Sequence, residues 1–117
     1  MPANSAATDE QYEEHIRLAS QAETLYREVE KVGGKKPTEI LPYSVAKKIN
    51  HLVKLTRKAV GKDPFLDAVE PLAESGAYDQ YGEAVVVLAE LRTALDHRWD
   101  SPGFRAARRS RGELLME

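Results

Sequence analysis

Apolar residues recur at every third or fourth position along several stretches of this 117-residue chain, and no stretch alternates apolar with polar residues. Such spacing places side chains on one face of an α-helix, whereas a β-strand needs a period of two. The long stretches cover residues 8–33, 42–60 and 77–99, and a shorter one follows Asp63. The sequence therefore predicts an all-α fold, an antiparallel up-down helical bundle of three long helices plus one short helix.

Capping residues, glycines and prolines predict where these helices end. Thr8 and Gln11 have the spacing of a capping box, so the first helix is expected to begin after Thr8. Gly33-Gly34 predicts a left-handed C-cap, because glycine adopts positive φ without steric cost. Asp63 followed by proline is typical of an N-cap, and Pro71 predicts that the helix after Asp63 is short.

The order of these segments predicts one domain. We expect residues 1–7 to be a disordered N-terminus, 8–103 the helical bundle domain, and 104–117 a basic C-terminal tail, flexible or forming a short helix. The N-terminus has no basic flank and no apolar run, as a secretory signal would. The longest apolar run, 84–89, is far shorter than the ~20 residues that cross a bilayer. A cytoplasmic location with no membrane contact is the expectation.

The net charge of −2 conceals a strong separation of charge along the chain. Residues 1–30 carry a net −5, residues 31–62 a net +8, residues 63–100 a net −7, and the remainder a net +2. Blocks of one sign are typical of interaction surfaces. The predicted helix at 42–60 therefore lies between two acidic helices in sequence.

The outer face of this helix is cationic. At 100° per residue, Lys47, Lys54 and Lys58 fall within about 40° of one another, with His51 beside them. Three interpretations compete. The acidic helices neutralise the lysines across the bundle, or the face binds the phosphates of nucleic acid, or it binds an acidic protein or an anionic membrane surface. The candidate polyanion-binding residues here are Lys47, Lys48, Lys54, Arg57 and Lys58.

Two further segments are candidates for binding. The C-terminal arginines Arg105, Arg108 and Arg109 are either solvated or ordered by a polyanion. Residues 84–89 are apolar nearly all round the helix, so this helix is either the central one or is covered by another chain, as in a homodimer. The second alternative predicts a protein interface at Val86, Val87, Leu91 and Ala94.

The residue types and their spacing give little support for catalysis or metal binding. The chain has no cysteine, none of its three histidines follows a glutamate at the Glu-x-x-His spacing, and no serine lies in a Gly-x-Ser-x-Gly elbow. We expect no metal, no cofactor, no small-molecule ligand and no catalytic residue. The sequence favours a non-enzymatic helical interaction module, a small subunit or adaptor, with a nucleic-acid-associated protein that binds phosphates through residues 42–60 as the alternative.

Overall fold

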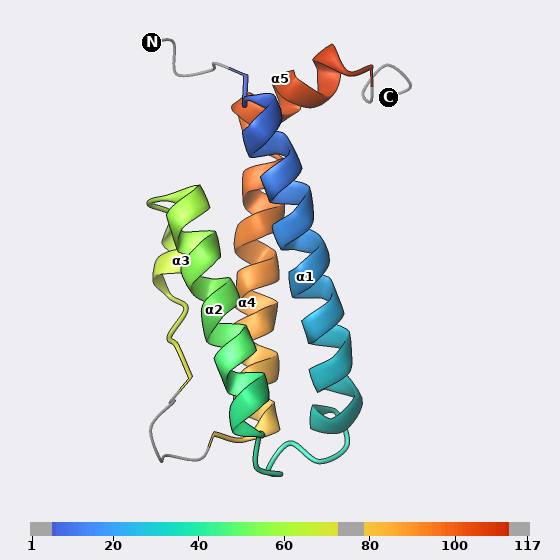
Figure 1. Cartoon of the computed structure of the whole chain (residues 1–117), viewed down its shortest axis with the longest axis vertical. Coiled ribbons are helices and arrows are strands. Elements are labelled where there is room, and N and C mark those ends of the chain that lie inside the picture. The colour runs from blue at the N-terminus through green and yellow to red at the C-terminus, as the bar shows by residue number, and fades with distance from the viewer. Residues whose placement is uncertain (1–5, 73–78, 113–117) are drawn as a thin grey trace.

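The computed structural model describes residues 6–72 and 79–112, and in these ranges it holds five α-helices and no strand (Figure 1). Three long helices lie side by side, with the first running opposite to the other two, which confirms the predicted all-α helical bundle. A short helix flanks the bundle and another crosses its end. The elements are α1 (Asp9–Gly33), α2 (Tyr43–Val60), α3 (Pro64–Asp67), α4 (Tyr81–Trp99) and α5 (Pro102–Ser110).

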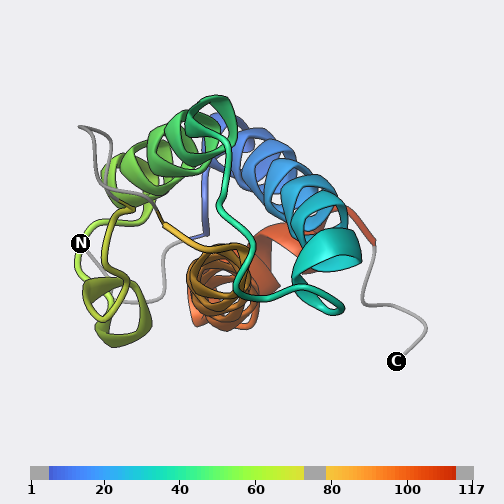
Figure 2. The ribbon, with the colours of Figure 1, turned by 90° about the horizontal axis from the view of Figure 1, so that it is seen from below.

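The fourth helix is the central one. It contacts each of the other four helices, and the view along the bundle shows α1 and α2 closing over one side of it (Figure 2). Val87, Leu91 and Ala94 are buried in the chain's own core, with Val87 only 8% exposed. The predicted protein interface is therefore wrong for these three residues, because helices of the same chain cover them. Val86 alone of the predicted set is exposed, at 54%.

The ends of α1 confirm one capping prediction and correct another. The Gln11 backbone N–H donates to Thr8 Oγ1 at 3.1 Å and the Thr8 N–H donates to Gln11 Oε1 at 2.9 Å, which is the predicted capping box. The left-handed C-cap is wrong, because Gly34 has a φ of −67°. Gly33 instead permits close approach of α4, since a Cβ there would lie 2.8 Å from Val85 Cγ2 and 3.3 Å from the Tyr81 carbonyl oxygen.

The central helix begins later than the sequence predicts. Its first residue is Tyr81, while the predicted residues 77 and 78 lie outside the described ranges. The Leu41 N–H donates to the Asp79 carbonyl at 2.7 Å, and the Tyr81 N–H donates to the Glu39 carbonyl at 2.9 Å. The backbone just before α4 therefore pairs with the loop between α1 and α2 rather than with a helical turn.

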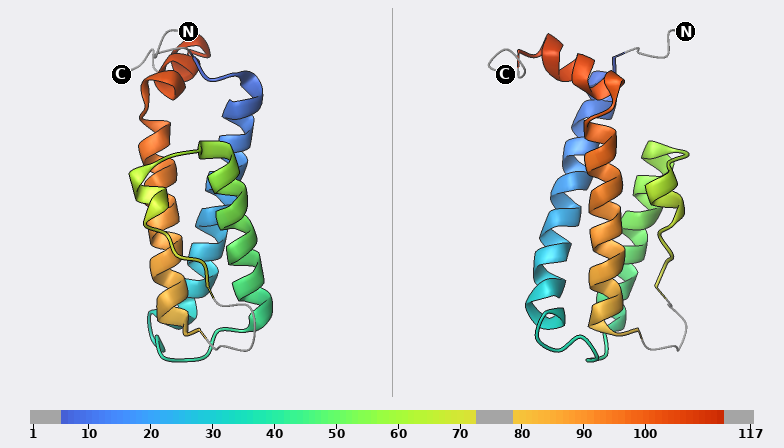
Figure 3. Two further views of the ribbon diagram at one scale, coloured as in Figure 1. Left: turned by 90° about the vertical axis from the view of Figure 1, so that its left-hand side faces the viewer. Right: turned by 180° about the vertical axis from the view of Figure 1, so that it is seen from behind.

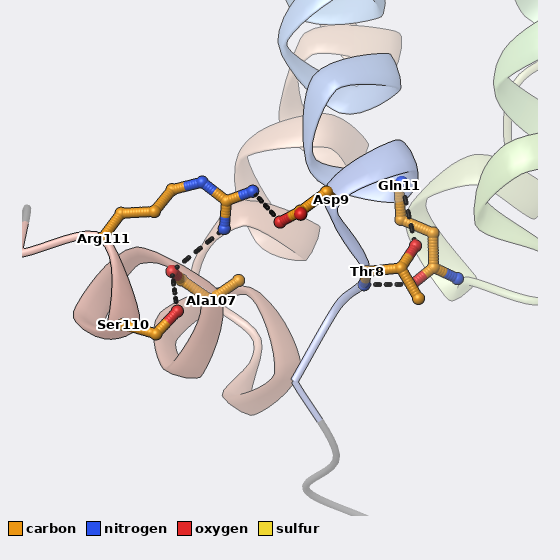
Figure 4. Close-up of polar contacts among 6 residues, drawn as sticks. All are labelled: Thr8, Asp9, Gln11, Ala107, Ser110 and Arg111. Carbon is orange, nitrogen blue, oxygen red and sulfur yellow. Dashed lines mark hydrogen bonds and ion pairs between the residues drawn. The ribbon is translucent and has the colours of Figure 1, made fainter.

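The predicted boundary at residue 103 falls inside α5, which spans Pro102–Ser110. Phe104 and Ala107 are buried against Tyr12 of α1, in a small cluster separate from the main core. Arg111 adds an ion pair to Asp9, drawn in Figure 4 beside the capping box. At the other terminus, the Ala7 N–H donates to the Gly103 carbonyl at 3.0 Å, and residues 1–5 lie outside the described ranges.

The close approach at Gly33 makes a prediction about stability. Gly33→Ala is expected to lower the free energy of unfolding by about 1 kcal/mol, because overpacking against Val85 exceeds the gain in helix propensity. Val85→Ala removes the methyl that would clash, so Gly33→Ala should lower the free energy of unfolding by a smaller amount in the Val85→Ala background. Denaturant unfolding of the two single variants and the double variant measures this coupling. Additive effects of the two changes would contradict the proposed contact.

Candidate polyanion-binding site

Helix α2 turns one face inward and leaves the opposite face to solvent. Its buried residues are Ala46, Ile49, Leu52, Val53 and Thr56. The Thr56 hydroxyl donates to the Leu52 carbonyl at 2.8 Å, which satisfies the one polar side chain among them. The five predicted basic residues of this helix are all exposed. The helix is thus amphipathic in the sense that the sequence predicts, with cations on its outer side.

The lysines of α2 are not paired with the acidic helices in the described part of the chain. None of the ion pairs found within residues 6–72 and 79–112 involves a basic residue of α2. Direct ion pairs of the described residues therefore do not support the interpretation in which α1 and α4 neutralise α2, although Glu14 and Lys58 line the same hollow between α1 and α2. The charges of this face are directed at solvent.

At the level of Lys48 and His51, the seam between α1 and α2 shows why no ion pair forms. Beside Lys48 and His51, α1 presents the uncharged side chains of Ser20, Gln21 and Thr24. The nearby Glu23 carboxylate instead contacts Arg92 of α4 at 2.8 Å. The acids of α1 are thus numerous in sequence but do not face the lysines at this level of the bundle.

A groove of about 960 Å³ lies between α2 and the irregular segment that follows α3. Lys47, Lys48 and Lys54 line its α2 side, together with His51. Apolar atoms reach the groove from residues such as Val53 and Leu72. A concave surface with cationic walls and apolar lining is suited to binding an anionic ligand that also carries apolar groups.

Two polar side chains of α2 hold the far wall of this groove in place. Asn50 Nδ2 donates to the Leu72 carbonyl at 2.6 Å, and the Leu72 N–H donates to Asn50 Oδ1 at 2.8 Å. The Arg57 guanidinium donates to the Val69 carbonyl. Arg57, predicted as a polyanion ligand, therefore braces the wall, and Asn50 is a site residue that the sequence analysis missed. The only signal for Asn50 was a residue of poor helix propensity inside a helix.

The predicted C-terminal arginines do not join the α2 face. α5 packs on α1 and α4 and crosses the end of the bundle beyond the last turn of α2 (Figure 3). The Arg108 side chain is only 12% exposed; it lies 4.7 Å above the Trp99 ring and donates to the Trp99 carbonyl at 3.1 Å. Arg105 and Arg109 are exposed on α5. The polyanion-binding candidates are thus two separate groups.

His15 is enclosed by aromatic rings at the α5 end of the bundle. It is 2% exposed, and its ring centroid lies 5.2 Å from that of Trp99 and 4.8 Å from that of Phe104. Burial, together with the positive charge of Arg98, lowers the pKa of His15 to about 4. The ring is therefore uncharged near neutral pH and has no route to a substrate.

His97 of α4 contacts the carboxylate of Asp63, the N-cap of the short helix α3. Its Nδ1 lies 3.1 Å from Asp63 Oδ2, while Asp63 Oδ1 accepts from the Phe65 and Leu66 amides. Burial opposes ionisation of Asp63, but the hydrogen bonds from His97 and the two amides outweigh it and lower its pKa. This pair secures α3 against α4 and gives His97 a structural role.

Two further features are absent from the described residues. No group of three or more potential ligands among their histidines, aspartates and glutamates could hold a metal ion. None of their helices is both long enough and apolar enough to span a membrane.

The chain matches no protein-family model, no curated protein and no solved structure. The class that its fold defines is a small helical bundle with a cationic groove on one long helix.

The double hydrogen bond of Asn50 gives a prediction. Asn50→Ala is expected to lower the free energy of unfolding by about 1–3 kcal/mol, because it leaves both backbone groups of Leu72 without this partner. Hydrogen exchange should show faster exchange of the Leu72 amide in particular. Ser44→Ala, at an exposed position on the same groove, serves as control and should change stability by less than about 0.5 kcal/mol. An unchanged Leu72 exchange rate would contradict the assignment.

The lowered pKa of His15 gives a second prediction. The unfolded state binds a proton near pH 6.5 but the folded state only near pH 4, so the stability contributed by neutral His15 is present above pH 6.5 and is lost as pH falls toward 4. The loss should reach at most roughly 3 kcal/mol. Denaturant unfolding at several pH values, followed by the fluorescence of the single tryptophan, measures it. His15→Phe should remove this part of the pH dependence of stability. An unaltered pH profile in that variant would show that His15 is not its source.

Proposed function

We propose that this chain is a non-enzymatic interaction module that binds an anionic partner through the exposed basic face of α2. The observation that carries the proposal is the exposure of Lys47, Lys48, Lys54 and Lys58 without an ion pair in the described part of the chain. Unpaired surface lysines need not give up existing partners when they bind, so an anionic ligand gains the full electrostatic attraction.

The surroundings of the histidines support a role without catalysis. His15 is enclosed by rings, His97 contacts a helix-capping aspartate, and His51 lies among lysines on the outer face. A general base or nucleophile needs an acid or an orienting partner within reach of a substrate. None of the three histidines has that arrangement among the described residues.

Nucleic acid is the second candidate partner. Lys47, Lys54 and Lys58 form a row about 16 Å long on one helix face. Such a row fits the regularly spaced charges of a phosphate backbone, and lysine contacts phosphate as a point charge without reading bases. The exposed Tyr43 is the only aromatic side chain of α2, which offers little surface for base stacking.

Charge reversal tests the proposed surface. Lys47→Glu combined with Lys54→Glu is expected to weaken binding of polyglutamate or of an oligothymidylate at low salt by roughly tenfold or more. The change removes two positive charges that attract the ligand and adds two negative charges that repel it. Fluorescence anisotropy of the labelled polyanion is the measurement, and wild-type binding should weaken as salt rises.

The matched control carries the same change of net charge on α1, at residues that do not line the groove. Arg27→Glu combined with Lys31→Glu alters two exposed residues of α1 and should leave binding within about threefold of wild type, because screening limits distant charges. Equal losses of polyanion binding in the two double variants would show that net charge alone, and not the α2 face, accounts for binding. A wild-type protein that binds neither polyanion would eliminate the proposal.

A further inference from the structure

We infer that the anionic partner is an acidic polypeptide segment interspersed with apolar residues, which lies in the groove between α2 and residues 69–72. This inference rests on the proposed function and narrows it to one class of ligand.

The lining of the groove combines charge with apolar surface. Lys47 and Lys54 stand on the α2 side, and the apolar surface open to solvent comes from the exposed Pro71 and the aliphatic stems of the lysines, because Val53 and Leu72 are buried. Phosphates alone would neutralise the lysines and leave those atoms in water. A peptide with leucine-like side chains beside its carboxylates would cover them, and burial of apolar surface is the main favourable term in association.

Helix α2 already binds a stretch of non-helical polypeptide. The segment after α3 runs alongside α2 in Figure 1, and Asn50 both donates to and accepts from the backbone of Leu72. Arg57 contacts the Val69 carbonyl in the same segment. These bonds hold the segment in place as one wall of the groove and leave the lysines of α2 for a ligand. The groove lies directly beside this segment, so a second strand of polypeptide would run next to the first.

The cationic surface has the length of a short peptide. α2 contains 18 residues and is therefore about 27 Å long, which equals the span of about eight residues of extended chain.

Three labelled probes of equal length distinguish the ligand classes. They are a peptide of about eight residues that alternates glutamate with leucine, the same peptide with serine for leucine, and an oligothymidylate of about eight nucleotides. By fluorescence anisotropy, the Glu/Leu peptide should bind wild-type protein roughly tenfold more tightly than either of the others. The Lys47→Glu/Lys54→Glu variant should lose this binding, and the Arg27→Glu/Lys31→Glu variant should retain it.

A steric variant locates the peptide without changing charge. Ser44 is exposed and lines the groove, so Ser44→Trp should fill part of it and weaken binding of the Glu/Leu peptide roughly tenfold. Thr93→Trp, on the exposed face of α4, is the matched control and should bind as wild type does. Circular dichroism verifies folding of both variants. Peptide-induced shifts of the Lys54 and Leu72 amide resonances in the wild-type protein provide a second, mutation-free readout.

The outcomes separate this inference from the function on which it rests. Tighter binding of the oligothymidylate, or equal binding of the Glu/Leu and Glu/Ser peptides, would overturn the acidic-apolar peptide while leaving α2 as the polyanion surface. Full binding by Ser44→Trp, with no amide shifts at the groove, would overturn the location. Self-association at low salt that the α2 charge reversal abolishes would make a second copy the occupant. If no probe binds, both proposals fail.

Discussion

The close packing of α4 in the middle of the bundle is the constraint on which the rest of this structure depends. Small side chains make it possible: Ala22 of α1 and Ala84 and Ala94 of α4 have no exposed surface, and Gly33 has no room for a Cβ beside Val85. The leucines of α4 then fill the space between the helices. Because the interior is densely packed, moving this seam would disturb every other helix at once.

The position of α4 also determines the charge distribution of the surface. With α4 in the centre, α2 contributes only its apolar side to the core, and its lysines are left outside. The Glu23 carboxylate of α1 contacts Arg92 of α4 rather than a lysine of α2. Segregated charge along the sequence thus becomes segregated charge in space, which is the physical basis for assigning the binding surface to α2.

The C-terminal arginines illustrate how a basic segment can serve the fold. Arg98, Arg108 and Arg111 lie over the rings of Phe104, Trp99 and Tyr12, respectively, and so cover an apolar cluster with their guanidinium planes. Guanidinium groups are weakly hydrated and stack well on aromatic faces. Sequence alone shows a run of positive charge there, and only the contacts show that part of it stabilises α5.

Periodicity and capping chemistry determined the helices themselves, the N-caps at Thr8 and Asp63, and the cationic face of α2, because each depends on residues within a few positions of one another. Tertiary structure alone decided the role of Gly33, the start of α4 and the Asn50 brace, whose partner is 22 residues away. The prediction that one face of α4 binds another chain failed because its true neighbours are residues far away in the sequence. A helical pattern identifies an apolar side but not the neighbour that covers it.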